Sequence, residues 1–253
     1  MKRSVTDWGG NVVALVIVIA ANAMANGVPL GGQTTGEISA KYPSLFTPAG
    51  FTFGIWGLIY TLLIAFVVWQ ALPGQRNNQR IAAIGPLFIA NCLANAAWIF
   101  VWHYDLLWLS LLLMFAILGT LVKILSILDA SGPPANASEA ILLRLPFSIY
   151  TGWITVATIA NISCVQVAMG WDDAGLSRLD WTLFKLAIAG AIGAIVILRK
   201  HDIAYVLVIA WAAYGVASKQ TDTPEVVGAA TVLAVVAVLL ALATVVMRRK
   251  SES

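Results

Sequence analysis

The segment Thr47–Leu62, TPAGFTFGIWGLIYTL, begins with loop-forming residues and continues without a break into an apolar helix. Phe53, Trp56 and Tyr60 are spaced so that all three project from one face of that helix. Aromatic side chains in membrane proteins gather at the water interface, yet this row runs inward along the helix. The segment therefore predicts a membrane helix whose rings either anchor the chain at the surface or line an internal cavity.

The composition is that of an integral membrane protein. Of 253 residues, 60% are hydrophobic and only 11% are charged, and the mean hydropathy is +0.87. Soluble domains have roughly 25% charged residues, so these charges are too few to cover a globule in water. The net charge of +3 does not indicate a nucleic-acid partner, because the basic residues stand at helix ends rather than on one face.

Eight apolar segments are long enough to cross a hydrocarbon layer of about 30 Å. We therefore expect an all-α, multi-pass membrane protein of about eight transmembrane helices with no strong internal repeat. The seventh segment is short. The predicted spans are Asn11–Ala25, Phe51–Ala71, Ile81–Trp102, Leu106–Leu128, Ile141–Ala168, Trp181–Leu198, Ile203–Ala217 and Glu225–Met247.

The distribution of Lys and Arg predicts the orientation. With a cytoplasmic N-terminus and eight spans, eleven basic residues fall inside and four outside, which satisfies the positive-inside rule. Both termini are then cytoplasmic, and we expect a bacterial inner membrane. The inner residues are Lys2, Arg3, Arg76, Arg80, Lys123, Arg144, Arg199, Lys200, Arg248, Arg249 and Lys250; the outer ones are Lys41, Arg178, Lys185 and Lys219.

The start of the chain leaves an alternative open. Lys2 and Arg3 precede an apolar run that ends in Ala23-Met24-Ala25, the small-residue pattern of a signal-peptide cleavage site. The run is also long enough to remain as a helix. We expect residues 1–25 to be retained as the first span.

The spans carry almost no groups for acid–base or metal chemistry. No HExxH, CxxC, GxSxG or phosphate-loop pattern occurs in the sequence. His103 and His201 are expected at opposite ends of the membrane, as interfacial residues that cannot share a metal. Lys185 is near enough to its helix end to snorkel to water. Cys92 and Cys164 are predicted to be packed thiols within apolar segments. We expect no enzyme, no catalytic residues and no metal site.

The predicted spans contain uncharged polar side chains and aromatic side chains. Asn91, Asn95 and Asn161 lie within predicted helices, where an amide either bridges helices or contacts a ligand. Interior indoles beside them suit simple core packing and a flat apolar ligand equally well. Trp56, Trp98, Trp153 and Trp211 are predicted at least one turn inside their spans, while Trp8, Trp69, Trp102, Trp108, Trp171 and Trp181 fit an interfacial belt.

Three motifs, in order along the chain, resemble those of the tryptophan-rich sensory protein family, the TspO or translocator proteins, also known as peripheral benzodiazepine receptors. They are Pro48…Phe53-Gly-Ile-Trp56…Tyr60, Asn95-Ala-Ala-Trp98 and Trp153-Ile-Thr-Val-Ala-Thr…Asn161. They are similar to the family's signatures on its second, third and fifth helices, and the resemblance covers about residues 8–168. One departure affects the pocket wall: Pro146 precedes Trp153 by seven positions rather than four, and Tyr150 stands near the place of the family's proline.

The resemblance implies a five-helix bundle over residues 1–170 and a three-helix membrane extension over residues 171–253. It also implies a binding protein, either a sensor or a carrier, for a flat hydrophobic ligand such as a porphyrin or another tetrapyrrole. No cofactor is required, and a bound porphyrin or lipid-like molecule is compatible with the site. The ligand-binding residues it implies are Pro48, Phe53, Trp56, Tyr60, Asn95, Trp98, Tyr150, Trp153 and Asn161.

Two other functions stay open. A small-solute transporter would need carboxylates or broken helices in the membrane, whereas the twelve acidic residues map to loops or helix ends. A structural or assembly subunit would use the last three helices as a docking surface. The expected partners are the lipid bilayer and a hydrophobic small molecule, and a homodimer or a membrane-complex partner stays open.

Overall fold

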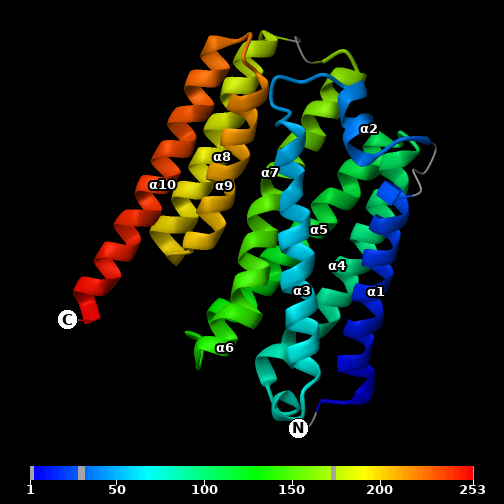
Figure 1. The fold of residues 1–253 in the computed structure, drawn as a ribbon, viewed down its shortest axis with the longest axis vertical. Helices are drawn as coiled ribbons and strands as arrows, with labels where there is room; N and C mark the ends of the chain where they lie inside the picture. Colours follow the sequence, from blue (N-terminus) through cyan, green and yellow to red (C-terminus); the bar gives the residue numbers. More distant parts are fainter. Residues whose placement is uncertain (1–2, 28–31, 172–174, 253) are drawn as a thin grey trace. The chain divides into compact units, whose positions relative to one another are not determined.

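The computed structural model describes residues 3–27, 32–171 and 175–252, and these residues form helices, short helical turns and loops, with no β-strand among them (Figure 1). Lys2, one of the predicted inner cations, lies outside the described residues. Contacts divide the chain into two compact units. Unit 1 comprises residues 1–38 and 56–151, and unit 2 comprises residues 39–55 and 152–253.

Within the described residues, seven helices have the length and apolar character of membrane spans. They are α1 (Val5–Gly27), α3 (Ile55–Ala71), α4 (Gln79–His103), α5 (Leu107–Ala130), α7 (Leu145–Ala168), α8 (Arg178–Lys200) and α10 (Pro224–Glu252). The remaining predicted span is α9 (Ile203–Lys219), an apolar helix of 17 residues. The all-α, multi-pass fold class is confirmed. α3 is also 17 residues long, but the preceding turn η2 extends its apolar span to Gly50–Ala71.

Short helical turns connect the long helices. α2 (Thr35–Lys41) and the 3-10 turn η2 (Gly50–Gly54) lie in the first long connection, and η3 (Pro73–Gln75) follows α3. α6 (Ala137–Glu139) leads into a π turn, η4 (Ala140–Arg144), just before α7. Pro146, at the second position of α7, has no N–H for the preceding turn, and the π turn accommodates that missing hydrogen bond.

The centre of unit 1 is a cluster of three phenylalanines from three helices. Phe66 on α3, Phe88 on α4 and Phe147 on α7 are fully buried and meet edge to face, with ring centroids 5.2 to 6.0 Å apart. Edge-to-face pairs place the positive ring edge against the negative face, which favours this arrangement over parallel stacking. α4 also packs along both α1 and α5, so it is the central helix of this unit.

Polar contacts hold the predicted inner ends of the unit 1 helices. The Arg3 guanidinium donates to Asp7 at 2.8 Å and to the side-chain and backbone oxygens of Gln70 on α3. Arg80 on α4 pairs with Glu139 at 2.9 Å. Basic residues that the sequence assigns to orientation therefore also bind neighbouring helix ends, because a buried cation needs an acceptor.

In unit 2, α8, α9 and α10 pack side by side (Figure 1). Their shared core is made of small and β-branched residues, Ile197, Val206, Ala210, Ala237 and Ala241. The second half of α7 approaches α9 closely, since a Cβ on Gly152 would lie 3.0 Å from the Tyr205 carbonyl oxygen. Small residues at such crossings let membrane helices approach without cavities.

The connection that contains η2 is bound to α9 within unit 2. The Ala49 N–H donates to the Gly215 carbonyl at 2.9 Å, and the Trp211 indole N–H donates to the Thr52 carbonyl at 3.0 Å. A Cβ on Gly215 would lie only 2.1 Å from the Thr52 hydroxyl oxygen, so a residue without a side chain is required there. The segment before the second span is thus fixed in place by a helix more than 150 positions further along the chain.

Candidate functional site

Four of the predicted ligand-binding residues form one connected group in unit 1, which we call the aromatic–amide cluster: Trp56, Tyr60, Asn95 and Tyr150. The Trp56 and Tyr60 rings, one turn apart on α3, are nearly parallel with centroids 5.5 Å apart. The edge of Tyr150 meets the Trp56 ring at 5.8 Å. The sequence spacing of Trp56 and Tyr60 correctly predicted that both rings lie on one face of the helix.

The amide of Asn95 connects three helices within the cluster. Its Nδ2 donates to the Tyr150 hydroxyl at 2.5 Å, and its Oδ1 accepts from Nδ2 of Asn22 on α1 at 3.1 Å. Asn95 and Tyr150 are 1% and 2% exposed. The Asn95 side chain therefore bridges helices, as an amide in an apolar environment must, and it also lies beside the aromatic rings.

Trp98, one turn after Asn95, is buried in unit 1 and stacks on Trp102 with ring centroids 5.7 Å apart. Its indole N–H meets no hydrogen-bond acceptor among the described residues. A buried donor of this kind normally has a partner in the protein, a water or a ligand. The Trp98 N–H is thus a polar group near the cluster that a ligand atom could satisfy.

The other predicted residues belong to unit 2. Phe53 meets Trp153 edge to face at 5.8 Å, so the first and third sequence motifs do come together there. Pro48 is buried in the connection bound to α9, and Asn161 is buried on α7. Whether any of these nine residues contacts a ligand stays a prediction.

Burial by neighbouring elements does not follow the depth along a span that the sequence predicts. Trp102 and Trp69, expected in an interfacial belt, are buried, and the Trp102 indole donates to the Thr35 carbonyl of α2. Trp211, expected inside, is 37% exposed. His103, expected at the interface, is buried with Nδ1 2.7 Å from the Ile99 carbonyl oxygen. Position along a span determines depth, whereas the neighbouring elements determine exposure.

Asn91 shows how the N–H group of an amide can bridge two helices. Its Nδ2 donates to the Ile117 carbonyl at 3.1 Å and the Thr120 hydroxyl at 2.9 Å, which links α4 to α5. Cys92 and Cys164 are buried free thiols, as predicted. In the part of the chain that the structure describes, no three His, Cys, Asp or Glu side chains come close enough to hold a metal.

Sequence reasoning missed the contribution of α9. Trp211, Gly215 and Gln220 together hold the connection before α3, with Gln220 Nε2 donating to the carbonyls of Ser44 and Thr47. The one available signal was Gly215 inside an apolar helix, since such a glycine often marks a close backbone approach. The last helices thus support the segment that carries the first motif.

The fold and the aromatic–amide cluster define a multi-pass helical membrane protein with aromatic and amide side chains inside its helix packing. The profile of the TSPO-like protein family matches residues 8–244. The chain belongs to this family, and the match extends past residue 168 to include the last three helices. Comparisons with curated proteins and with solved structures found no match.

Proposed function

We propose that this membrane protein of the TspO type binds a flat hydrophobic ligand, of tetrapyrrole class, as a sensor or carrier. The observation that carries the proposal is the aromatic–amide cluster, in which stacked Trp56 and Tyr60 rings lie beside the buried Asn95 amide. Extended π faces favour a flat apolar guest, and a few polar groups orient it. Family membership supports the same assignment.

The polar groups near the cluster suit a ligand with a polar edge. Asn95 has both amide atoms engaged with protein partners, whereas the Trp98 N–H has no acceptor among the described residues. A ligand carbonyl or carboxylate oxygen would supply that acceptor and remove the cost of a buried unsatisfied donor. Trp56 and Tyr60 then supply most of the contact area, and Trp98 selects for an acceptor.

Quenching of tryptophan fluorescence by added protoporphyrin IX tests the proposal. We expect saturable quenching for the parent protein in detergent, and a dissociation constant about tenfold weaker for Trp56→Leu, because one stacking face and its apolar area are lost. The matched control is Trp108→Leu, since Trp108 is 54% exposed on α5. Equal dissociation constants for Trp56→Leu, Trp108→Leu and the parent would contradict the proposed site.

A further inference from the structure

A groove of about 440 Å³ runs along the surface of unit 2 between α9 and α10. Every described residue that lines it is apolar or aromatic. Ligand pockets have volumes of about 300–1,000 Å³ and mostly apolar walls, so the groove is large enough for the ring of a small lipid. Its walls include Ala210, Trp211 and Tyr214 on α9 and Ala234, Val238 and Leu239 on α10.

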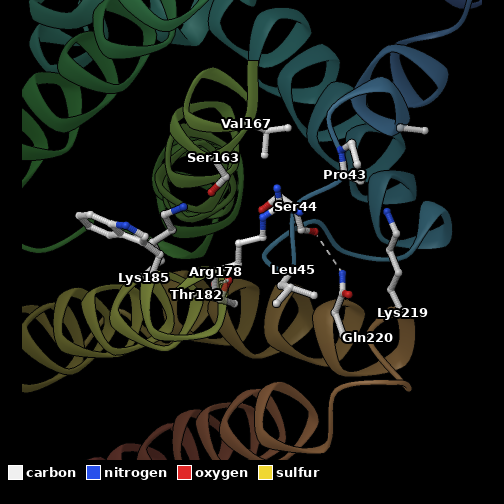
Figure 2. Close-up of a pocket in the computed structure, with 12 residues that line it drawn as sticks. Pro43, Ser44, Leu45, Ser163, Val167, Arg178, Thr182, Lys185, Lys219 and Gln220 are labelled. Atoms are coloured by element: carbon white, nitrogen blue, oxygen red, sulfur yellow. Dashed lines mark hydrogen bonds between the residues drawn. The ribbon is translucent and has the colours of Figure 1, made fainter. Parts of the chain in front are cut away.

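The groove differs from a second pocket of unit 2, of about 460 Å³, where α7, α8 and α9 meet the connection around Ser44 (Figure 2). Arg178, Lys185 and Lys219 line that second pocket. Lys185 was predicted to snorkel to water but is only 8% exposed, and Arg178 and Lys185 each have an interaction within the chain. These two cations are therefore already engaged, whereas the α9–α10 groove presents exposed aromatic rings.

Three aromatic side chains, which we call the aromatic platform, meet at one end of the groove. Trp211 and Tyr214 lie one turn apart on α9, with ring centroids 6.3 Å apart. Phe51, from the turn η2, meets Trp211 edge to face at 5.5 Å and Tyr214 at 5.8 Å. Phe51, Trp211 and Tyr214 are 49%, 37% and 55% exposed. The platform is therefore open at the surface, unlike the phenylalanine cluster of unit 1.

Hydrogen bonds fix the platform in place. The Trp211 indole N–H donates to the Thr52 carbonyl, next to Phe51, at 3.0 Å. Gln220, just after α9, donates to the Ser44 carbonyl in the same connection (Figure 2). An interfacial tryptophan directs its N–H to water and headgroups, whereas this N–H is used inside the protein. The exposed part of the indole ring is thus preorganised, and a ligand that stacks on it does not have to order it.

The Tyr214 hydroxyl is the polar group that the groove offers to a ligand. Among the described lining residues, the only other polar side-chain group is the Trp211 N–H, which is occupied. Tyr214 lies five residues before the end of α9 at Lys219, which is about 8 Å along the helix. The rest of the groove extends from there toward the middle of α9. A matching ligand carries an acceptor near the predicted outer end of α9 and an apolar body below it.

We propose that this groove binds a membrane quinone, a lipid with a flat, electron-poor ring, two ring carbonyl oxygens and an apolar isoprenoid tail. The faces of tryptophan and tyrosine rings are negative, so they attract the electron-poor face of such a ring. A ring carbonyl accepts a hydrogen bond from the Tyr214 hydroxyl, and the tail follows the aliphatic side chains of α10. An acyl chain at the same place offers no rigid ring and loses more conformational freedom on binding. The proposal concerns unit 2 and is independent of the aromatic–amide cluster.

The test uses the whole chain, labelled with 5-fluorotryptophan, in phosphatidylcholine nanodiscs. Fluorine NMR reports on each tryptophan, and the variants Trp211→Phe and Trp108→Phe assign two of the resonances. The probe is decylubiquinone, and the comparison compound is phytol, which has an isoprenoid chain but no ring. Trp108 is 54% exposed on α5, so its resonance reports quinone that is merely dissolved in the lipid.

Two variants test the groove, and each has a matched control. Tyr214→Phe removes the hydroxyl and keeps the ring, and its control is Tyr104→Phe, at an exposed tyrosine of unit 1. Ala234→Phe fills the groove from α10. Its control is Val246→Phe, which places the same ring at an exposed position of α10 outside the groove.

For the parent, we expect decylubiquinone to shift the Trp211 resonance saturably and phytol to leave it unchanged. Tyr214→Phe should bind about fivefold more weakly because one hydrogen bond is lost. Ala234→Phe should lose the saturable shift, while both controls titrate like the parent. A Trp211 resonance that stays fixed, or that responds no more saturably than that of Trp108, overturns the proposal whether or not the variants fold. An equal response to phytol would overturn the choice of a quinone, and an unchanged titration in folded Ala234→Phe would overturn the groove as the site.

Discussion

The Asn95 side-chain amide donates a hydrogen bond to the Tyr150 hydroxyl, with 2.5 Å between nitrogen and oxygen, and so joins α4 to α7 within unit 1. Both side chains are buried. The same Tyr150 ring meets Trp56. One residue therefore contributes to helix packing through its hydroxyl and to the aromatic–amide cluster through its ring.

Tyr150→Phe should separate these two contributions. The ring remains, but the Asn95 N–H group loses its acceptor, so we expect the free energy of unfolding to fall by about 1 kcal/mol. Titration with sodium dodecyl sulfate in mixed micelles, followed by circular dichroism, measures the change. Tyr104→Phe is the control because the Tyr104 side chain is exposed. Equal stability of the two variants would show that the Asn95–Tyr150 hydrogen bond contributes nothing.

Gly215→Ala should loosen the connection before α3. A Cβ at this position would lie 2.1 Å from the Thr52 hydroxyl oxygen, so the segment that includes Ala49 and Thr52 must move and its hydrogen bonds to α9 must weaken. We expect faster proteolysis in residues 44–52 and a lower unfolding temperature. Gly119→Ala is the control, since a Cβ there meets nothing within 4 Å and alanine favours the helix. Unchanged proteolysis in Gly215→Ala would contradict the close contact.

The crossing of α9 can be tested by the location of the two termini. Its 17 residues span roughly 25 Å, near the lower limit for a membrane helix. If α9 crosses, the chain has eight crossings and both termini are cytoplasmic. A green fluorescent protein fused after Ser253 should then fluoresce, and alkaline phosphatase inserted after Asp222 should be active. A dark C-terminal fusion would contradict eight crossings that start from a cytoplasmic N-terminus.

The stability of the first turn of α2 should depend on pH through Glu37. The backbone N–H and the hydroxyl of Thr34 both donate to its carboxylate, at 2.6 and 2.9 Å, and these hydrogen bonds lower the pKa of Glu37. A lowered pKa means that the stabilisation is present above the pKa of the unfolded chain and is lost as pH falls through the lowered value. Amide hydrogen exchange of residues 35–41, corrected for intrinsic rates, should accelerate in acid. Glu37→Gln keeps the capping geometry and should remove this acceleration. An acceleration in acid that persists in Glu37→Gln would exclude Glu37 as its source.

The sequence was sufficient to locate the helices because a bilayer demands long apolar segments. The predicted span Ile203–Ala217 and the helix Ile203–Lys219, for example, begin at the same residue. The pairing of Trp56 with Tyr60 was also predictable, since it depends only on helical spacing within one segment.

Contacts between distant segments could not be predicted in this way. Nothing in the local pattern indicates that Trp211 donates to the Thr52 carbonyl or that α2 covers Trp102. The burial of Lys185 was missed for the same reason, because the snorkelling rule considers the helix alone. Depth within a span is therefore a poor guide to the burial of a side chain whose neighbours come from distant segments.

The most direct test of the ligand site is a titration of protoporphyrin IX, followed by its Soret band, with the protein in nanodiscs. For the parent, we predict a spectral shift that saturates at one equivalent and exceeds the shift with empty nanodiscs. Replacing Trp56 and Tyr60 together by leucine should abolish the saturable component. A parent spectrum identical to that of empty nanodiscs, or an unchanged titration in the double variant, would contradict the assignment of the aromatic–amide cluster as a ligand site.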